Sequence, residues 1–206
     1  MKELTIFTSE SVTAGHPDKL SDQVSDAIVD HFLARDPLST VDAECAVASG
    51  ILFISAQYAS TANLDLVAIA RNVIAGAGYP KNVFDANNCT VMTSIKDQSA
   101  MRPRFDLEEL GDRGLDKITA RHQVTLFGYA CSQTEALMPL PIWLAHRLSE
   151  RMDSAEVQEK IPYLLPDGKS QVAVGYRDGK IKGLRGINLV ASQSDSSAAD
   201  LDQLRE

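Results

Sequence analysis

The 206-residue sequence predicts an α+β protein made of two similar units. Apolar residues recur at helical spacing in three segments, and this pattern indicates amphipathic helices over 17–34, 63–75 and 139–152. Segments rich in β-branched and apolar residues lie between them and indicate strands. The elements follow the order helix–strands–helix–strand and then strand–helix–hairpin–helix, which favours two α+β units although no close sequence repeat accompanies it.

Charge and cysteine content exclude several classes of protein. The formal net charge is −8, which argues against a general nucleic-acid-binding or anionic-membrane surface. No apolar run approaches the ~20 residues that span a bilayer, and the amino terminus lacks a signal-peptide core. Three widely spaced cysteines, without metal-ligand spacing, fit a reducing compartment. The sequence therefore predicts a cytoplasmic protein without nucleic-acid or membrane partners.

A loop that runs directly into the first predicted helix contains several side chains that could bind a ligand. Pro17 suits the first helical position, where its missing N–H costs nothing. Asp18 follows at the positive end of the helix, and His16 and Lys19 flank this pair. Free backbone N–H groups and Lys19 would hold polyphosphate oxygens, while Asp18 would bind Mg²⁺. The alternative is an ordinary amphipathic helix with an acidic first turn.

The first half of the chain predicts a sheet with two helices. Residues 3–8 alternate as a short strand that leads into the loop. Residues 41–59 form either one long strand or two strands bent at Gly50. The helix over 63–75 ends at a glycine- and proline-rich segment, and 88–95 forms a further strand.

The second half predicts a strand, a helix, a hairpin and a final helix. Two strands that flank Asp178-Gly179 form the hairpin, since Asp-Gly is a strong turn signal. A serine at 196 or 197 would begin the last helix. The expected strands are 123–130, 171–176 and 181–192.

Several motifs resemble those of the methionine adenosyltransferase (S-adenosylmethionine synthetase) family. The string 8–19 reads Thr-Ser-Glu-Ser-Val-x-x-Gly-His-Pro-Asp-Lys, which is similar to the amino-terminal motif of that family. Leu-Pro-Asp-Gly-Lys-Ser-Gln-Val at 165–172 is similar to the family's Arg-Pro-Asp-x-Lys-Ser-Gln-Val, and Leu-Phe-Gly-Tyr-Ala at 126–130 to its Met-Phe-Gly-Tyr-Ala strand. The resemblance covers nearly the whole chain.

The resemblance implies the fold and its division into domains. The family fold has three pseudo-threefold-related α/β units, with mixed or antiparallel sheets and helices on one face, and this chain corresponds to two of them. The expected domains are an amino-terminal unit at 1–99, a mobile active-site loop at 100–121 and a central unit at 122–206. A full family chain is much longer, so this sequence holds only part of the family's active site.

The resemblance also implies the site residues. The expected catalytic residues are His16 and Lys169. The expected metal ligands are Asp18 for Mg²⁺ and Glu44 for K⁺, although Glu44 also fits the exposed face of an ordinary strand. The residues implied to bind ATP and its phosphates are His16, Pro17, Lys19, His122, Asp167 and Lys169. The residues implied to bind L-methionine are Gln57 and Gln98.

Two of these positions depart from the family pattern. Gln57 stands where the family carries a glutamate that contacts methionine, so the substrate ammonium loses a charge-assisted hydrogen bond. His122 stands in place of an aspartate that contacts the nucleoside. A histidine can stack on a base or hydrogen-bond to it, but a half-exposed surface histidine is the plainer interpretation.

The resemblance implies formation of S-adenosylmethionine from ATP and L-methionine, with release of phosphate and diphosphate. One hypothesis is an enzyme subunit that needs a second, family-related chain in a hetero-oligomer. Another is a non-catalytic structural or regulatory subunit, which Gln57 and His122 favour and the two intact phosphate motifs oppose. A truncated chain is the third.

Overall fold

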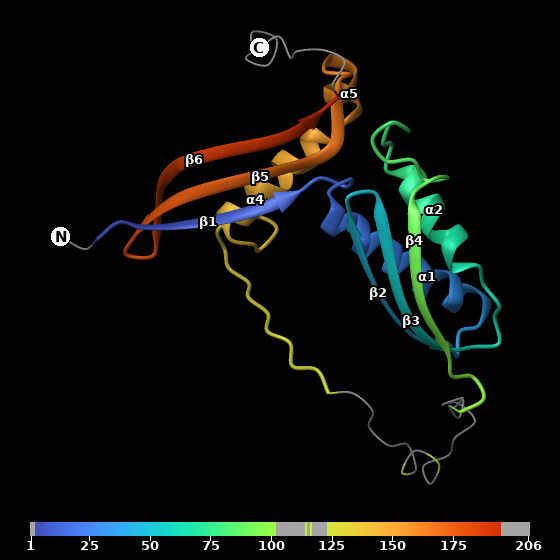
Figure 1. Cartoon of the computed structure of the whole chain (residues 1–206). Coiled ribbons are helices and arrows are strands. Elements are labelled where there is room, and N and C mark those ends of the chain that lie inside the picture. The colour runs from blue at the N-terminus through green and yellow to red at the C-terminus, as the bar shows by residue number, and fades with distance from the viewer. Residues whose placement is uncertain (1–2, 102–113, 115, 117–122, 195–206) are drawn as a thin grey trace. The chain divides into compact units, whose positions relative to one another are not determined.

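The chain folds into two compact units, each with its own three-stranded sheet (Figure 1). The computed structural model describes residues 3–101, 114, 116 and 123–194. We call the two parts unit 1, with residues 1–20, 75–85 and 129–206, and unit 2, with residues 21–74 and 86–128. Each unit combines strands with helices, so the predicted α+β class is confirmed.

The sheet of unit 1 has the order β1-β5-β6 and is antiparallel throughout. Its strands are β1 (Thr5–Val12), β5 (Leu164–Arg177) and β6 (Lys180–Gln193). Asp178 and Gly179 join β5 to β6 with φ angles of 54° and 72°. Two successive left-handed residues form the turn that matches the twist of a hairpin, which confirms the predicted hairpin.

Helix α4 (Leu140–Met152) packs on β1 and β5 and forms the core of unit 1. Val172 and Val174 of β5 and Ala145 of α4 are fully buried in this core. Because side chains alternate along a strand, Lys169 and Gln171 lie on the opposite face, which no helix in the described part of the chain covers. After α4 comes α5 (Ala155–Lys160), capped by the Ser154 side chain.

The sheet of unit 2 has the order β2-β3-β4. Its elements are α1 (Pro17–Arg35), which begins in unit 1, β2 (Thr40–Ala48), β3 (Ile51–Ala59), α2 (Leu66–Gly76) and β4 (Thr90–Asp97). β2 and β3 pair antiparallel across Ser49-Gly50, so the predicted alternative of two bent strands is correct. β3 and β4 are parallel, and α2 lies in the crossover that this pairing requires.

One face of the unit 2 sheet is packed and the other is open. Leu52, Ile54 and Ala56 alternate along β3 and are buried. Helices α1 and α2 accompany this sheet (Figure 1). Phe32 of α1 contacts Tyr58, with ring centroids 4.5 Å apart. We call the other side the open face of the unit 2 sheet. It carries Asp42, Glu44, Ala46, Ala48, Ile51, Phe53, Ser55, Gln57, Thr90, Met92, Ser94 and Lys96.

The prediction of a strand over 123–130 is wrong. The segment is neither helix nor strand, and the Leu126 and Phe127 side chains are 87% and 95% exposed. A strand needs a partner for its backbone hydrogen bonds, and the described residues provide none for this segment. The predicted final helix lies outside the described residues.

The predicted domain boundaries at 99 and 122 stay a prediction. The pairing of β1 with β5 joins the amino-terminal strand to the sheet of the carboxy-terminal half.

The helix predicted over 63–75 starts later, at Leu66. In the described part of the chain, no helix is long and apolar enough to cross a membrane.

A buried carboxylate joins the end of α1 to the end of β3. Asp36 is only 5% exposed. One of its oxygens accepts the Thr61 N–H at 2.7 Å and the Ser60 hydroxyl at 3.1 Å, and the other accepts the Leu38 N–H at 3.2 Å. The Thr61 N–H, together with the neighbouring hydroxyls, holds the pKa of Asp36 well below its usual range.

Replacing Asp36 with asparagine is expected to lower the melting temperature at pH 7. The ionised carboxylate accepts from every neighbour, whereas the asparagine NH₂ would face other donors. Because the folded pKa of Asp36 is depressed, its stabilisation is present above the unfolded pKa and is lost as pH falls through the acidic range. Thermal unfolding should therefore show a large deficit at pH 7 that begins to shrink only below the ordinary aspartate pKa of ~3.9. Asp30→Asn, an exposed position on the same helix, should show no deficit.

Candidate functional site

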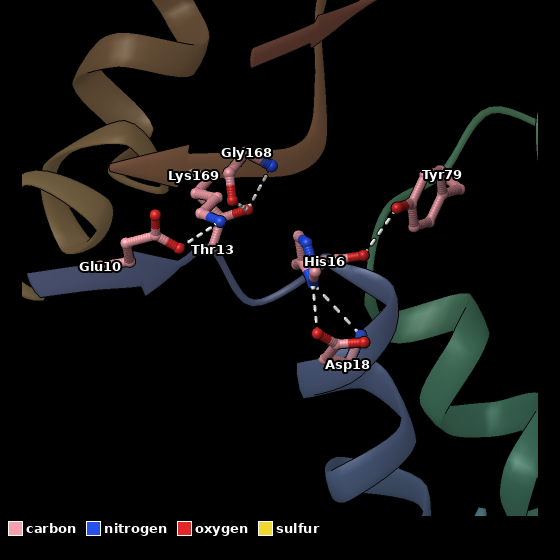
Figure 2. A network of polar contacts seen from close by, with 8 residues as sticks. Glu10, Thr13, His16, Asp18, Tyr79, Gly168 and Lys169 are labelled. Atoms are coloured by element: carbon pink, nitrogen blue, oxygen red, sulfur yellow. Dashed lines mark hydrogen bonds and ion pairs between the residues drawn. The ribbon is translucent and has the colours of Figure 1, made fainter. Parts of the chain in front are cut away.

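Strand pairing brings the two phosphate-type motifs together in unit 1. Val12, the last residue of β1, lies opposite Lys169 of β5. The next residue, Thr13, donates its N–H to the Gly168 carbonyl at 3.0 Å, and Gly168 donates its N–H to the Thr13 hydroxyl at 2.6 Å (Figure 2). The loop that contains His16 therefore leaves the sheet beside the start of the Lys-Ser-Gln motif.

The loop is held by contacts on several sides. The Tyr79 hydroxyl donates to the Gly15 carbonyl at 2.6 Å, and the Ala14 N–H donates to the Asp153 carboxylate at 2.8 Å. A side chain at Gly15 would place its Cβ 2.3 Å from the Pro166 Cβ, so glycine is required there. Burial, followed by the nearby charge of Asp167, raises the pKa of Tyr79 to about 12. Tyr79 thus keeps its proton and remains a donor at neutral pH.

His16 lies directly before α1 and presents one ring nitrogen as a donor. Its Nδ1 accepts the Asp18 backbone N–H at 3.2 Å (Figure 2). A neutral imidazole whose Nδ1 accepts carries its proton on Nε2. The His16 side chain is 23% exposed. Its Nε2 is therefore the donor that His16 can offer to an anionic ligand from solution.

The expectation of free backbone N–H groups in this loop is wrong for three residues. The N–H groups of Ala14, His16 and Asp18 donate to Asp153, to the Thr13 carbonyl and to the His16 ring. Two of these bonds lie within the loop and the third ties it to Asp153. The side chains of His16, Lys19 and Lys169 are further candidates for anion binding here.

Lys169 lies on the uncovered face of the unit 1 sheet and forms an ion pair with Glu10 (Figure 2). Gln171 donates to Glu10 at 2.6 Å, and Asn188 donates to Gln171 at 2.8 Å. The hydrogen bond from Lys169 is the largest cause of the lowered pKa of Glu10. A pocket of about 670 Å³ opens over this row, lined by Glu10, Lys169, Gln171, Ile187, Asn188, Leu189 and Val190.

Sequence reasoning did not single out Glu10, Gln171 and Asn188. Glu10 lies inside the amino-terminal motif, and the alternation of β1 would have placed it on a face different from that of Ser11. The register that aligns it with Gln171 is set by β1–β5 pairing, which no local pattern specifies. Asn188 is visible only as an amide in an otherwise apolar stretch of β6.

The other predicted residues of unit 1 lie close to this loop. Pro17 opens α1, and Lys19 is exposed in its first turn. Asp167 precedes Gly168 and accepts the Ser192 hydroxyl at 3.2 Å.

The predicted methionine residues meet in unit 2. The Gln98 side-chain amide donates to the Gln57 amide oxygen at 2.7 Å, and the Gln98 backbone N–H donates to the Tyr58 carbonyl at 2.7 Å. Gln57 points from the open face of the unit 2 sheet. Glu44 lies on the same face, one row away. The structure therefore brings Gln57 and Gln98 into direct contact, whereas His122 lies outside the described residues.

The carboxylates fit the proposed cations by chemistry but form no closed site. The Asp18 side chain is 89% exposed, which suits a Mg²⁺ ion shared with substrate phosphates. Glu44 shares a row with Ser55 and Ser94, so its carboxylate lies beside two hydroxyl-bearing residues that could supply further oxygen ligands. Among residues 3–101, 114, 116 and 123–194, no group of three His, Cys, Asp or Glu side chains could hold a metal ion by itself.

Comparisons with known proteins identify the family of the chain. Residues 4–100 match the model of the S-adenosylmethionine synthetase N-terminal domain, and residues 117–206 match that of its central domain. A relative named S-adenosylmethionine synthase from Gloeothece citriformis is 44% identical over 91% of this chain and 47% of its own length. The relative from Trichodesmium erythraeum is 39% identical over 100% of this chain and 51% of its own length. The relative from Synechococcus sp. RCC307 is 46% identical over 84% of this chain and 44% of its own length. The chain spans about half the length of these curated relatives, and it belongs to the S-adenosylmethionine synthetase family.

Proposed function

We propose that this chain supplies the amino-terminal and central parts of a methionine adenosyltransferase that makes S-adenosylmethionine from ATP and L-methionine. The observation that carries this proposal is the junction of Thr13 with Gly168, which joins the loop of His16 to the strand of Lys169. This junction places a donor side chain and a cationic side chain on adjoining segments, and both types of group bind polyphosphate oxygens.

In the proposed reaction, the methionine sulfur attacks C5′ of ATP. The S–C5′ bond forms as the C5′–O bond breaks, and the electron pair leaves with the triphosphate. His16 donates its Nε2 proton as a hydrogen bond to the leaving oxygen, and Lys169 and Lys19 stabilise the charge that develops on the phosphates. Hydrolysis of the triphosphate then releases phosphate and diphosphate. No protein nucleophile is needed, because the rate acceleration comes from alignment of the two substrates and from stabilisation of the charge on the leaving triphosphate.

Two cations complete the chemistry of the proposed site. Asp18 would hold Mg²⁺, which would supply additional positive charge at the leaving group. K⁺ would be held at Glu44.

The two free cysteines at intermediate burial and the buried Cys89 are consistent with a reducing cytoplasm, where we place the protein.

The remaining groups of the site would come from a second, family-related chain in a hetero-oligomer. The faces that carry Lys169, Glu44 and Gln57 are open in the described part of the chain, so another surface can cover them. A non-catalytic subunit is the second candidate, because the Gln57–Gln98 pair holds no negative charge for the substrate ammonium.

The test is S-adenosylmethionine formation with ATP, L-methionine, Mg²⁺ and K⁺. The purified chain alone is expected to give no turnover, and addition of a co-purified family-related chain is expected to give it. Robust turnover by the chain alone would contradict the need for a partner. Absence of turnover with every related chain that assembles with this one would favour the non-catalytic subunit.

A further inference from the structure

The open face of the unit 2 sheet carries a row of three polar side chains with opposite charges at its ends. Asp42 on β2 lies opposite Gln57 on β3, and Gln57 lies opposite Lys96 on β4. Neighbouring strands are ~4.8 Å apart, so the backbones of Asp42 and Lys96 are about 10 Å apart. All three side chains are exposed, and neither Asp42 nor Lys96 has an ion-pair partner among the described residues.

Gln57 carries no negative charge to offer an ammonium group. Its amide oxygen already accepts the Gln98 amide at 2.7 Å, which leaves its NH₂ group pointing elsewhere. An NH₂ group suits a carboxylate and offers nothing to an ammonium group. A charge-assisted hydrogen bond to the ammonium of an amino acid needs a carboxylate near Gln57, and Asp42 is the carboxylate on the same row.

Lys96 supplies the opposite charge on the other side of Gln57. Its long, flexible side chain can bend toward the middle strand, as the short side chain of Asp42 cannot. The row thus offers an anion, a neutral donor and a cation in sequence across three strands. The charges at its two ends complement the ammonium and the carboxylate of a zwitterion.

We propose that Asp42, Gln57 and Lys96 form a cradle for the head group of the amino-acid substrate, with Asp42 binding its ammonium and Lys96 its carboxylate. The inference rests on the proposed function for the identity of the substrate. The thioether of methionine would then extend away from these three side chains. Asp42 in this way replaces the negative charge that a glutamine at 57 does not provide.

The experiment measures equilibrium binding to the purified chain, together with its partner where the two co-purify. The probes are L-methionine, 3-(methylthio)propylamine, which has only the amine, and 3-(methylthio)propionate, which has only the carboxylate. The variants are Asp42→Asn and Lys96→Met, with Asp30→Asn on α1 as the control carboxylate.

A crossed pattern is expected. Asp42→Asn should weaken L-methionine and the amine by roughly tenfold or more and leave the propionate unchanged. Lys96→Met should weaken L-methionine and the propionate and leave the amine unchanged. Adding Gln57→Glu to Asp42→Asn should restore L-methionine binding, because it returns a carboxylate to the adjacent strand. A merely structural role would weaken all three probes together.

The outcomes separate this proposal from the proposed function. If the protein binds the probes in the crossed pattern but forms no S-adenosylmethionine, the cradle stands and the proposed reaction fails. If it forms S-adenosylmethionine but both variants bind L-methionine as the wild type does, the cradle is overturned and Asp42 and Lys96 are solvated surface charges. Lack of L-methionine binding by a wild-type protein that is folded also overturns the cradle.

Discussion

Replacing His16 with alanine is expected to reduce S-adenosylmethionine formation by the assembled protein by about 10²–10³-fold. The Nδ1 of His16 is occupied by the Asp18 N–H, so the imidazole offers a single, fixed donor at Nε2. Removing a donor that acts on developing charge lowers kcat far more than it weakens substrate binding. The measurement is the steady-state rate of S-adenosylmethionine formation, with the KM for ATP determined alongside it.

The matched control is His31→Ala on the same helix. His31 is exposed, and its Nδ1 contacts the Ala27 carbonyl at 2.7 Å one turn earlier. This variant should keep its activity, and both variants should elute as the wild-type complex does in size-exclusion chromatography. A His16→Ala complex with full activity would rule out the proposed role of His16 in catalysis.

Replacing Gly15 with alanine is expected to disrupt the same loop by steric conflict. The added Cβ would lie 2.3 Å from the Pro166 Cβ and 2.8 Å from the Pro166 carbonyl oxygen. Because one of these contacts is with the backbone, no side-chain rotation relieves both. Forcing extra volume into a packed site costs typically 1–3 kcal/mol, and here it also pushes the His16 loop away from the Lys169 strand. A lowered melting temperature and a loss of activity should appear together.

Gly76→Ala provides the control for this prediction. An added Cβ at Gly76 meets no atom within 4 Å, and alanine is favoured over glycine in a helix. Its melting temperature should equal or exceed that of the wild type, with unchanged activity. If Gly15→Ala behaved in the same way, the close approach of the loop to Pro166 would not be needed for the site.

The elements that local patterns specify were predicted well. The helix at 17–35 follows from its apolar spacing and from Pro17, and the hairpin follows from Asp178-Gly179. The prediction of a strand at 123–130 failed because a local resemblance to a family strand indicates only that the segment can pair. Whether it pairs depends on a partner strand, which lies outside any local window.

The candidate site divides in the same way. Motif strings singled out His16, Lys19, Asp167 and Lys169 as candidates without a structure. Glu10 escaped notice because its importance comes from the ion pair with Lys169, and this contact joins two strands far apart in the sequence. The free N–H groups were wrongly expected because the loop's own hydrogen bonds were not visible in the sequence.

The sequence by itself determined the α+β class, the identity of the phosphate-type motifs and the family they resemble, because these depend on residue type and on spacing within short segments. Only the tertiary structure decided that β1 pairs with β5 and that Gln57 touches Gln98. It also decided that Asp42 and Lys96 flank Gln57 in one row. Strand register is fixed by the burial of whole faces, a property of the folded sheet that no single segment encodes.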